Sequence, residues 1–180
     1  MERDLPDQKT AESAQGDRLH LYQRHSEYER RVLAPAEQDL LRLTDALKRE
    51  TFDTIGLHSA YKEQKETHLE NDVISGHPDL LRFYESGPGV ILEYKFGWSQ
   101  VEPADLNLQT RVYAVLSPTE DTYVAIIQPR LGFNDRITIA RYGPEIKAQA
   151  DAQIRAILAA SEAQDEIGRA SCRERVCLYV

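Results

Sequence analysis

The chain of 180 residues has little cysteine: there are two, Cys172 and Cys177, both close to the C-terminus. The rest of the chain therefore offers no thiol for a disulfide, a thiolate zinc site or an iron–sulfur cluster. Long hydrophobic runs are also lacking, since no apolar stretch approaches the roughly 20 residues that span a bilayer. The N-terminus is polar and charged from its second residue. These absences predict a cytoplasmic protein without an export signal or membrane contact.

Positive charge is scarce as well. The chain carries 22 Lys and Arg against 30 Asp and Glu, a net charge of −8. This balance argues against a protein coated in nucleic-acid-binding charge, although it leaves room for a local basic groove. With 41% hydrophobic and 29% charged residues, the chain has the length and composition of one globular domain with a substantial core.

The end of the chain differs from its body. The stretch EIGRASCRERV, residues 166–176, resembles the translation of a short-read sequencing adapter. We therefore interpret residues 166–180 as a non-native tail and residues 1–165 as a single domain; a natural basic tail is the alternative. Without the tail, the body has 19 basic and 28 acidic residues and a net charge of −9.

Apolar periodicity predicts an α/β or α+β domain, in which helices pack on a mixed central sheet. The expected helices are residues 13–25, 35–52, 103–116 and a final one from 144. The expected strands are 73–76, 79–85, 89–97, 122–130 and 135–142. Residues 53–70 are predicted to be helix or loop. The core faces of the second and last helices are expected to comprise Ala36, Leu40, Leu43, Leu47, Ile146, Ala150, Ile154, Ile157 and Leu158.

Charged residues interrupt the hairpin predicted from strands 79–85 and 89–97. Glu93 and Lys95 alternate along one strand and so project from the same face, and a short turn could bring Asp79 beside Glu93. Adjacent carboxylates repel unless a cation lies between them, and such oxygen ligands suit Mg²⁺ or Mn²⁺. A lysine beside them completes a set suited to metal-assisted phosphodiester hydrolysis. Alternatively, Asp79 caps a turn, and Glu93 and Lys95 form the solvent face of an amphipathic strand.

The spacing Gly-His-Pro-Asp, 13 residues, then Glu-Tyr-Lys resembles the core motif of the PD-(D/E)XK nuclease superfamily. More specifically, the ordered motifs SGHPDLL, VILEYKFG and LQTRVYAVL are similar to the RecB-type branch found in phages and prophages. The branch pattern G-x-x-x-H, G-x-x-D, (D/E)-x-K and Q-x-x-x-Y matches Gly16, His20, Gly76, Asp79, Glu93, Lys95, Gln109 and Tyr113. A glutamate before the G-x-x-D strand is matched by Glu63, or by Glu66 in a less favoured register. The resemblance covers roughly residues 10–160.

The resemblance implies a restriction-endonuclease-like core with N-terminal helices and a long C-terminal helix. It also implies a stand-alone, metal-dependent DNA nuclease, more often an exonuclease, that acts in replication, recombination or repair in a bacterial or phage-infected cell. The type that carries an iron–sulfur cluster is disfavoured, because its four cysteines are missing here. DNA single strands or duplex ends are the expected partners, and a recombination or single-strand-binding protein is a possible helper for so acidic a chain.

Site roles follow from the resemblance for each matching residue. His20, Asp79, Glu93 and the backbone carbonyl of Tyr94 would bind Mg²⁺ or Mn²⁺, with the imidazole favouring Mn²⁺. Lys95 would be the catalytic lysine. Gln109 and Tyr113 would line the DNA side. The expected supporting residues are Gly16, Glu63 and Gly76. Separately, Arg130 at a strand end is a candidate for phosphate contact.

Two other functions are compatible with the sequence. One is a non-catalytic nucleic-acid-binding or recombination-accessory protein on the same fold, which would bind DNA without cutting it. An acidic adaptor whose helices bind a protein partner would bind no divalent metal.

Overall fold

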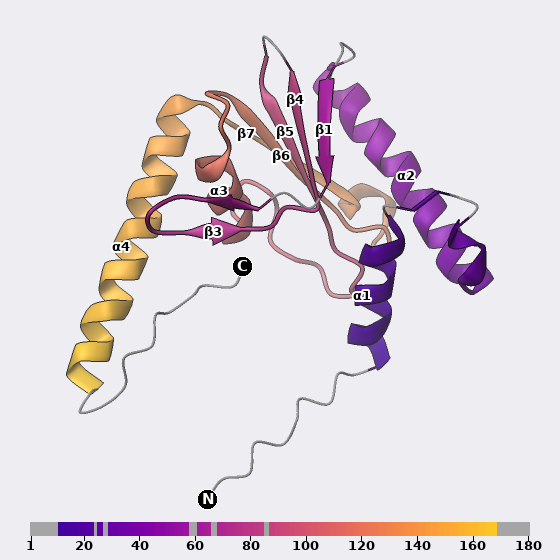
Figure 1. The fold of residues 1–180 in the computed structure, drawn as a ribbon, viewed down its shortest axis with the longest axis horizontal. Helices are drawn as coiled ribbons and strands as arrows, with labels where there is room; N and C mark the ends of the chain where they lie inside the picture. Colours follow the sequence, from indigo (N-terminus) through magenta and orange to yellow (C-terminus); the bar gives the residue numbers. More distant parts are fainter. Residues whose placement is uncertain are drawn as a thin grey trace, which may run out of the picture.

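The computed structural model describes residues 11–23, 25–26, 29–57, 61–65, 68–84 and 87–168, with the backbone alone for residues 12, 61–65 and 162–168. These residues form a five-stranded sheet with helices on both faces (Figure 1). The sequence-based prediction of an α/β fold, with a mixed sheet, N-terminal helices and a long C-terminal helix, is confirmed. None of the helices in the described part of the chain combines the length and hydrophobicity of a membrane span.

Helices and strands follow one another along the chain largely as the periodicity predicts. Their bounds are α1 (Ala11–Gln23), η1 (Glu29–Val32), α2 (Pro35–Ile55), β1 (Tyr61–Lys65), β2 (Leu69–Glu70), β3 (Ser75–Gly76), β4 (Leu80–Tyr84), β5 (Gly89–Tyr94), α3 (Leu108–Leu116), β6 (Thr122–Ile127), η2 (Phe133–Asp135), β7 (Ile137–Tyr142) and α4 (Pro144–Gly168). Residues 1–10 and 169–180, including most of the predicted tail, lie outside the described residues.

The prediction of helix or loop for residues 53–70 is wrong at residues 61–65 and 69–70, which form strands, and is right for residues 53–57 and 68. Apart from the end of α2, the described part of this range contains β1 and β2. The strand β1 has the sequence YKEQK and lies at one edge of the described sheet, next to β4. An edge strand needs little hydrophobicity and often carries charge, so its sequence looks like that of an exposed helix.

The sheet is mixed, with the order β1-β4-β5-β6-β7. The strands β4 and β5 form the predicted antiparallel hairpin, whereas β5 and β6 are parallel and are connected through α3. Parallel strands end at the same edge of a sheet, and β4, antiparallel to β5, begins there. The end of β5, the end of β6 and the beginning of β4 therefore meet at one edge.

Two hydrophobic cores cover the opposite faces of the sheet. On β5, Leu92 and Tyr94 face the core formed with α1 and α2, while Ile91 faces the core formed with α3 and α4. Glu93 shares the face of Ile91, as strand alternation requires. The buried carboxylate of Glu93 thus follows the apolar residue Ile91 on the same face of the strand.

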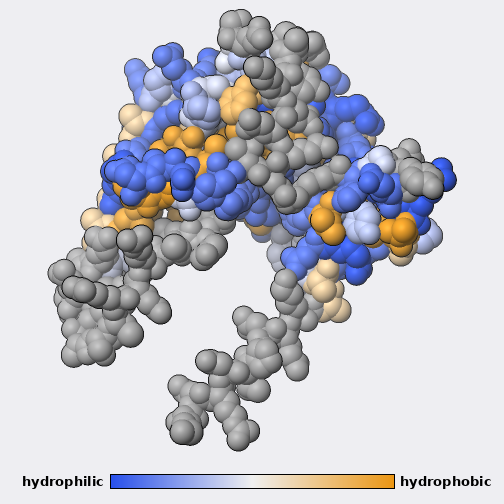
Figure 2. Space-filling model, viewed as in Figure 1, coloured by the Kyte–Doolittle hydropathy of each residue, from blue (hydrophilic) through white to orange (hydrophobic). Residues whose placement is uncertain are grey.

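Three residues expected in the core are exposed. On α2, Ala36 is exposed although Leu47 is buried. On α4, Ile146 and Ile157 are 48% and 47% exposed, because this helix packs on α3 and β7 through a narrow stripe that includes Ile154. Figure 2 shows a mainly hydrophilic face on which hydrophobic residues gather beside α4, around α3.

Candidate active site at the sheet edge

Strand register brings Asp79 to Glu93. Leu80 of β4 pairs with Leu92 of β5, so the next positions outward are Asp79 and Glu93. The Asp79 carboxylate accepts a hydrogen bond at Oδ2 from the Tyr94 backbone N–H, 2.8 Å away. The structure therefore places the two carboxylates side by side at the edge where β5 ends, as the hairpin hypothesis predicts.

His20 reaches this edge from α1. Its Nδ1 lies 3.2 Å from Asp79 Oδ1, although the two residues are 59 positions apart. The imidazole also makes an edge-to-face contact with Phe96, with ring centroids 5.0 Å apart. Burial opposes a charge on the ring, but the hydrogen bond to Asp79 and the negative charges of Asp79 and Glu93 outweigh it and raise the pKa of His20.

Gln109 connects the charged groups on the other side of the site. Its Oε1 accepts a hydrogen bond from Lys95 Nζ at 2.7 Å, and its Nε2 donates to Glu93 Oε1 at 2.9 Å. Lys95 Nζ itself donates to Glu93 Oε1 at 2.8 Å. The Asn107 side chain caps α3 by accepting from the Gln109 backbone N–H, and so fixes the first turn that presents this amide.

Tyr113 continues the network away from the carboxylates. Its hydroxyl accepts from Gln109 Nε2 at 2.7 Å and donates to the His77 carbonyl at 3.1 Å. Burial, together with the negative charge of Glu93, raises the pKa of Tyr113, so the hydroxyl stays protonated. Gly76 lies against this ring, because a Cβ added there would stand 2.7 Å from Tyr113 Cε1.

Glu93 has the most perturbed electrostatics of the cluster. Burial and then the negative charge of Asp79 raise the pKa of Glu93 to about 7, while Lys95 acts in the opposite direction. Its Oε1 accepts hydrogen bonds from two side chains, but its Oε2 is buried without a hydrogen-bond partner in the described structure. An unsatisfied buried carboxylate oxygen is costly in the absence of a cation or donor.

The side chains of His20, Asp79 and Glu93 carry the nitrogen and oxygen ligands that a divalent cation such as Mn²⁺ accepts, but they are not arranged around a common point. In the part of the chain that the structure describes, no three His, Cys, Asp or Glu side chains form a group that could hold a metal as they stand. The reason is that Glu93 Oε1 turns to Lys95 and Gln109, while Asp79 turns to His20 and to the Tyr94 N–H. A cation at this edge would use the free Glu93 Oε2 and the remaining lone pairs of Asp79.

The remaining candidate residues from the sequence contribute less to the carboxylate cluster. Glu63 pairs with Arg82 in the β1–β4 register, but its side chain lies outside the described residues, as does Glu66 altogether. Gly16 lies in α1, where an added Cβ would meet nothing within 4 Å, so packing does not require a glycine there. Arg130 bonds to Gln15 of α1 instead of joining the carboxylate cluster.

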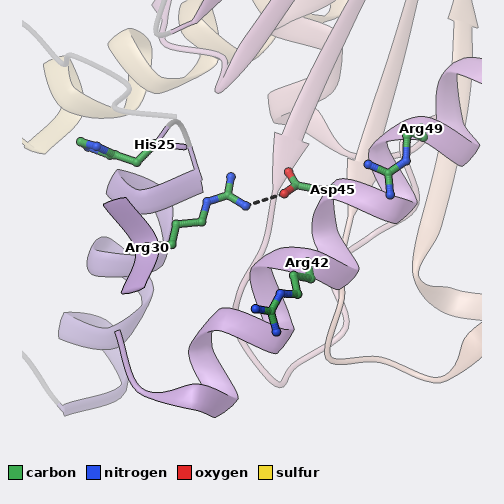
Figure 3. A pocket seen from close by; sticks show the side chains of 5 residues that line it. All are labelled: His25, Arg30, Arg42, Asp45 and Arg49. Atoms are coloured by element: carbon green, nitrogen blue, oxygen red, sulfur yellow. Dashed lines mark hydrogen bonds and ion pairs between the residues drawn. The ribbon is translucent and has the colours of Figure 1, made fainter. Parts of the chain in front are cut away.

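A cavity of about 440 Å³ lies between the segment after α1 and the helix α2 (Figure 3). Its lining residues are His25, Arg30, Arg42, Asp45 and Arg49. Arg30 crosses it to Asp45 and also donates to the Tyr22 and Gln23 carbonyls, so this arginine holds η1 against α2. None of the residues of the carboxylate cluster lines this cavity.

The sequence did not identify two residues that position site side chains: Asn107, which holds Gln109, and Phe96, which contacts His20. Asn107 had a usable signal, because an asparagine directly before a helical pattern is a typical N-cap. Phe96 had none, since an aromatic residue at the end of a strand does not indicate contact with a distant histidine. Its position became clear only once α1 was placed against the sheet.

No family model and no curated protein matches this chain. Among solved structures, the chain is similar to an alkaline exonuclease, LHK-Exo, from Laribacter hongkongensis, with 15% identity and a TM-score of 0.41 over 70% of this chain and 68% of that one. It is also similar to SSO0001, with 20% identity and a TM-score of 0.32 over 77% of this chain and 70% of that one. Scores this low assign no activity to the chain.

Proposed function

We propose that this protein is a divalent-metal-dependent deoxyribonuclease that hydrolyses phosphodiester bonds. The observation that carries the proposal is the convergence of His20, Asp79, Glu93 and Lys95 at one sheet edge, where one buried oxygen of Glu93 has no hydrogen-bond partner in the described part of the chain. A structural ion pair would need neither the second carboxylate nor the histidine. A carboxyl group with a strongly raised pKa beside a lysine, as Glu93 has, is typical of catalytic sites.

A Mg²⁺ or Mn²⁺ ion would be held by His20, Asp79, Glu93 and the Tyr94 carbonyl, and when bound it would supply positive charge for the phosphate and activation for water. His20 would present Nε2, because Nδ1 faces Asp79 and a donor hydrogen bond there leaves the lone pair on Nε2. Asp79 would thus orient the imidazole as well as contribute charge.

Lys95 is the group that would act on the substrate directly. Two of its three N–H donors are directed to Glu93 and Gln109, which fixes the position of the ammonium group. The third donor can bind a phosphate oxygen and stabilise the negative charge that develops there. Gln109 and Tyr113 would hold this lysine and the Glu93 carboxylate in place.

We further propose that the substrate is a DNA single strand or duplex end, and that the activity is exonucleolytic and belongs to replication, recombination or repair in a phage or prophage setting. The motif resemblance supports this finer assignment. A net charge of −8 disfavours long-lived binding to duplex DNA, and it is compatible with delivery of the DNA by a recombination or single-strand-binding protein.

The experiment is a cleavage assay with labelled linear single-stranded and duplex DNA in Mn²⁺ or Mg²⁺. Wild type is compared with Glu93→Ala, Lys95→Ala and the control Glu50→Ala, whose side chain is exposed on α2. We expect cleavage by wild type and by Glu50→Ala, with loss of at least about 100-fold in the two site variants.

The alternative, a non-catalytic nucleic-acid-binding protein on the same fold, predicts binding of the same DNA without cleavage in either metal. Cleavage that survives in both site variants would show that the activity comes from elsewhere or from a contaminant. Either result would overturn the proposal.

A further inference from the structure

The loop that follows β5 carries the single tryptophan of the chain. Trp98 comes three residues after Lys95, and 65% of it is exposed. Three residues of extended chain span at most about 11 Å, so the backbone of Trp98 lies within that distance of the backbone of the candidate catalytic lysine. A large aromatic surface at this place is available for contact with a substrate.

The Trp98 loop is held firmly against the end of β6. The buried side chain of Gln128 donates from Nε2 to the Ser99 carbonyl at 3.2 Å, and its Oε1 accepts from the Val101 N–H at 3.3 Å. Both bonds fasten the backbone directly after Trp98. The indole is therefore presented by a loop that is already ordered, which lowers the entropic cost of binding on it.

Arg130 places a positive charge against the indole ring of Trp98. Its guanidinium carbon lies 4.5 Å from the Trp98 ring centroid, and its Nη2 donates to Gln15 Oε1 of α1 at 2.8 Å. Its Nε is buried without a hydrogen-bond partner, and no carboxylate pairs with Arg130 among the described residues. An unpaired cation beneath an exposed aromatic face, in an acidic chain, attracts a ligand that is both aromatic and anionic.

We propose that Trp98, supported by Arg130, is a stacking platform for an unpaired base of the DNA strand, a few nucleotides from the bond to be cut. The inference rests on the proposed function, because its ligand is the nuclease substrate. Bases within a duplex have both faces covered by their neighbours, whereas an unpaired base offers a free face to the indole. The platform would thus favour single-stranded DNA or a frayed end, with little preference for sequence.

Tryptophan fluorescence tests this directly, since Trp98 is the only emitter of its kind. The Lys95→Ala variant is titrated in Mg²⁺ with a short oligothymidylate, and with an abasic oligonucleotide of the same length. We expect saturable quenching with the bases present and none with the abasic strand. Equal quenching by both strands would mean that only the phosphates bind, and it would overturn the stacking proposal.

Substitutions at position 98 separate stacking from simple apolar contact. Trp98→Leu is expected to weaken binding of a dye-labelled single strand by about 5- to 150-fold, as measured by anisotropy, whereas Trp98→Phe keeps most of the affinity. Equal affinities of wild type and Trp98→Leu would contradict the proposal. So would quenching by a blunt duplex that exceeds quenching by the single strand.

The two proposals fail separately. DNA cleavage by wild type without fluorescence quenching would leave the nuclease and remove the platform. Quenching in Lys95→Ala, combined with no cleavage by wild type in either metal, would leave a base-binding surface and remove the nuclease.

Discussion

Tyr113 and Gly76 show how closely single residues determine this site. The ring of Tyr113 is buried between α3 and β3, and its hydroxyl connects Gln109 to the His77 carbonyl. Gly76 permits that position because it has no side chain. Contact with the Tyr113 ring therefore explains why the G-x-x-D motif has a glycine at position 76, whereas no such contact explains the glycine at position 16.

The Gly76→Ala substitution is expected to reduce the free energy of unfolding by about 1 to 3 kcal/mol, because the new Cβ would overlap the Tyr113 ring. Urea unfolding measures the loss. The control Gly97→Ala, where an added Cβ meets nothing within 4 Å, should be nearly neutral.

A double-mutant cycle identifies the cause. In a Tyr113→Leu background, the cost of Gly76→Ala should shrink by at least half, since the ring edge is gone. An unchanged cost would show that the tyrosine is not what excludes a side chain at position 76.

At the scale of elements, α1 contacts the rest of the molecule through few buried hydrophobic residues and through several polar side chains. Leu19 is its one fully buried hydrophobic residue among those described. Glu37 of α2 accepts hydrogen bonds from Arg18 Nη2 at 2.6 Å and Arg18 Nε at 3.2 Å. This pair lies two residues from His20 along the chain, so it helps to set the position of the imidazole.

Replacing Glu37 by Gln should therefore destabilise the fold in a pH-dependent way. Burial alone would raise the pKa of Glu37, but hydrogen bonds from Arg18 and the Ala34 N–H outweigh it and lower the pKa below 4.5. A carboxylate with a lowered folded-state pKa stabilises the fold above its ordinary pKa, and this stabilisation is lost as pH falls through the folded-state value.

We expect Glu37→Gln to reduce the free energy of unfolding by about 1 kcal/mol at pH 7, and the difference from wild type to shrink as pH falls below the ordinary pKa of a glutamate. Chemical denaturation across this range measures it. Asp39→Asn, which removes an exposed acid two residues away, should change stability by less than about 0.5 kcal/mol at any pH. A pH-independent difference for Glu37→Gln would point to lost packing instead of lost charge.

For the whole molecule, the proposed site makes stability depend on divalent cations. An ion that binds only the folded state raises its stability by about 2.7 kcal/mol at a hundred times its dissociation constant. For a domain of this size, that corresponds to a rise in Tm of roughly 5 to 10 °C. Thermal unfolding without DNA, in Mn²⁺ and then with a chelator, measures the effect apart from catalysis.

The Glu93→Gln variant should lose most of this rise in Tm, while Glu50→Gln should keep it. Glu93 is the appropriate probe because its Oε2 is buried and has no hydrogen-bond partner among the described residues. Equal shifts in both variants would place the bound ion elsewhere on the acidic surface and would remove the metal site proposed here.

Local pattern predicted much of this protein. Strand alternation placed Glu93 and Lys95 on one face, and helical spacing placed Gln109 and Tyr113 together, because both periods are fixed by backbone geometry. The order of helices and strands after residue 73 followed from the same two periods. The charged edge strand β1 was not predicted, because a strand at the edge of a sheet needs few hydrophobic residues.

The sequence by itself thus determined the fold class and the residue types available for chemistry. Only the tertiary structure decided that Asp79 lies beside Glu93, that His20 reaches Asp79 from α1, and that Arg130 lies against Trp98. The physical reason is that strand register and helix docking are set by contacts between residues tens of positions apart in the sequence. A local hydrophobic period does not encode such contacts.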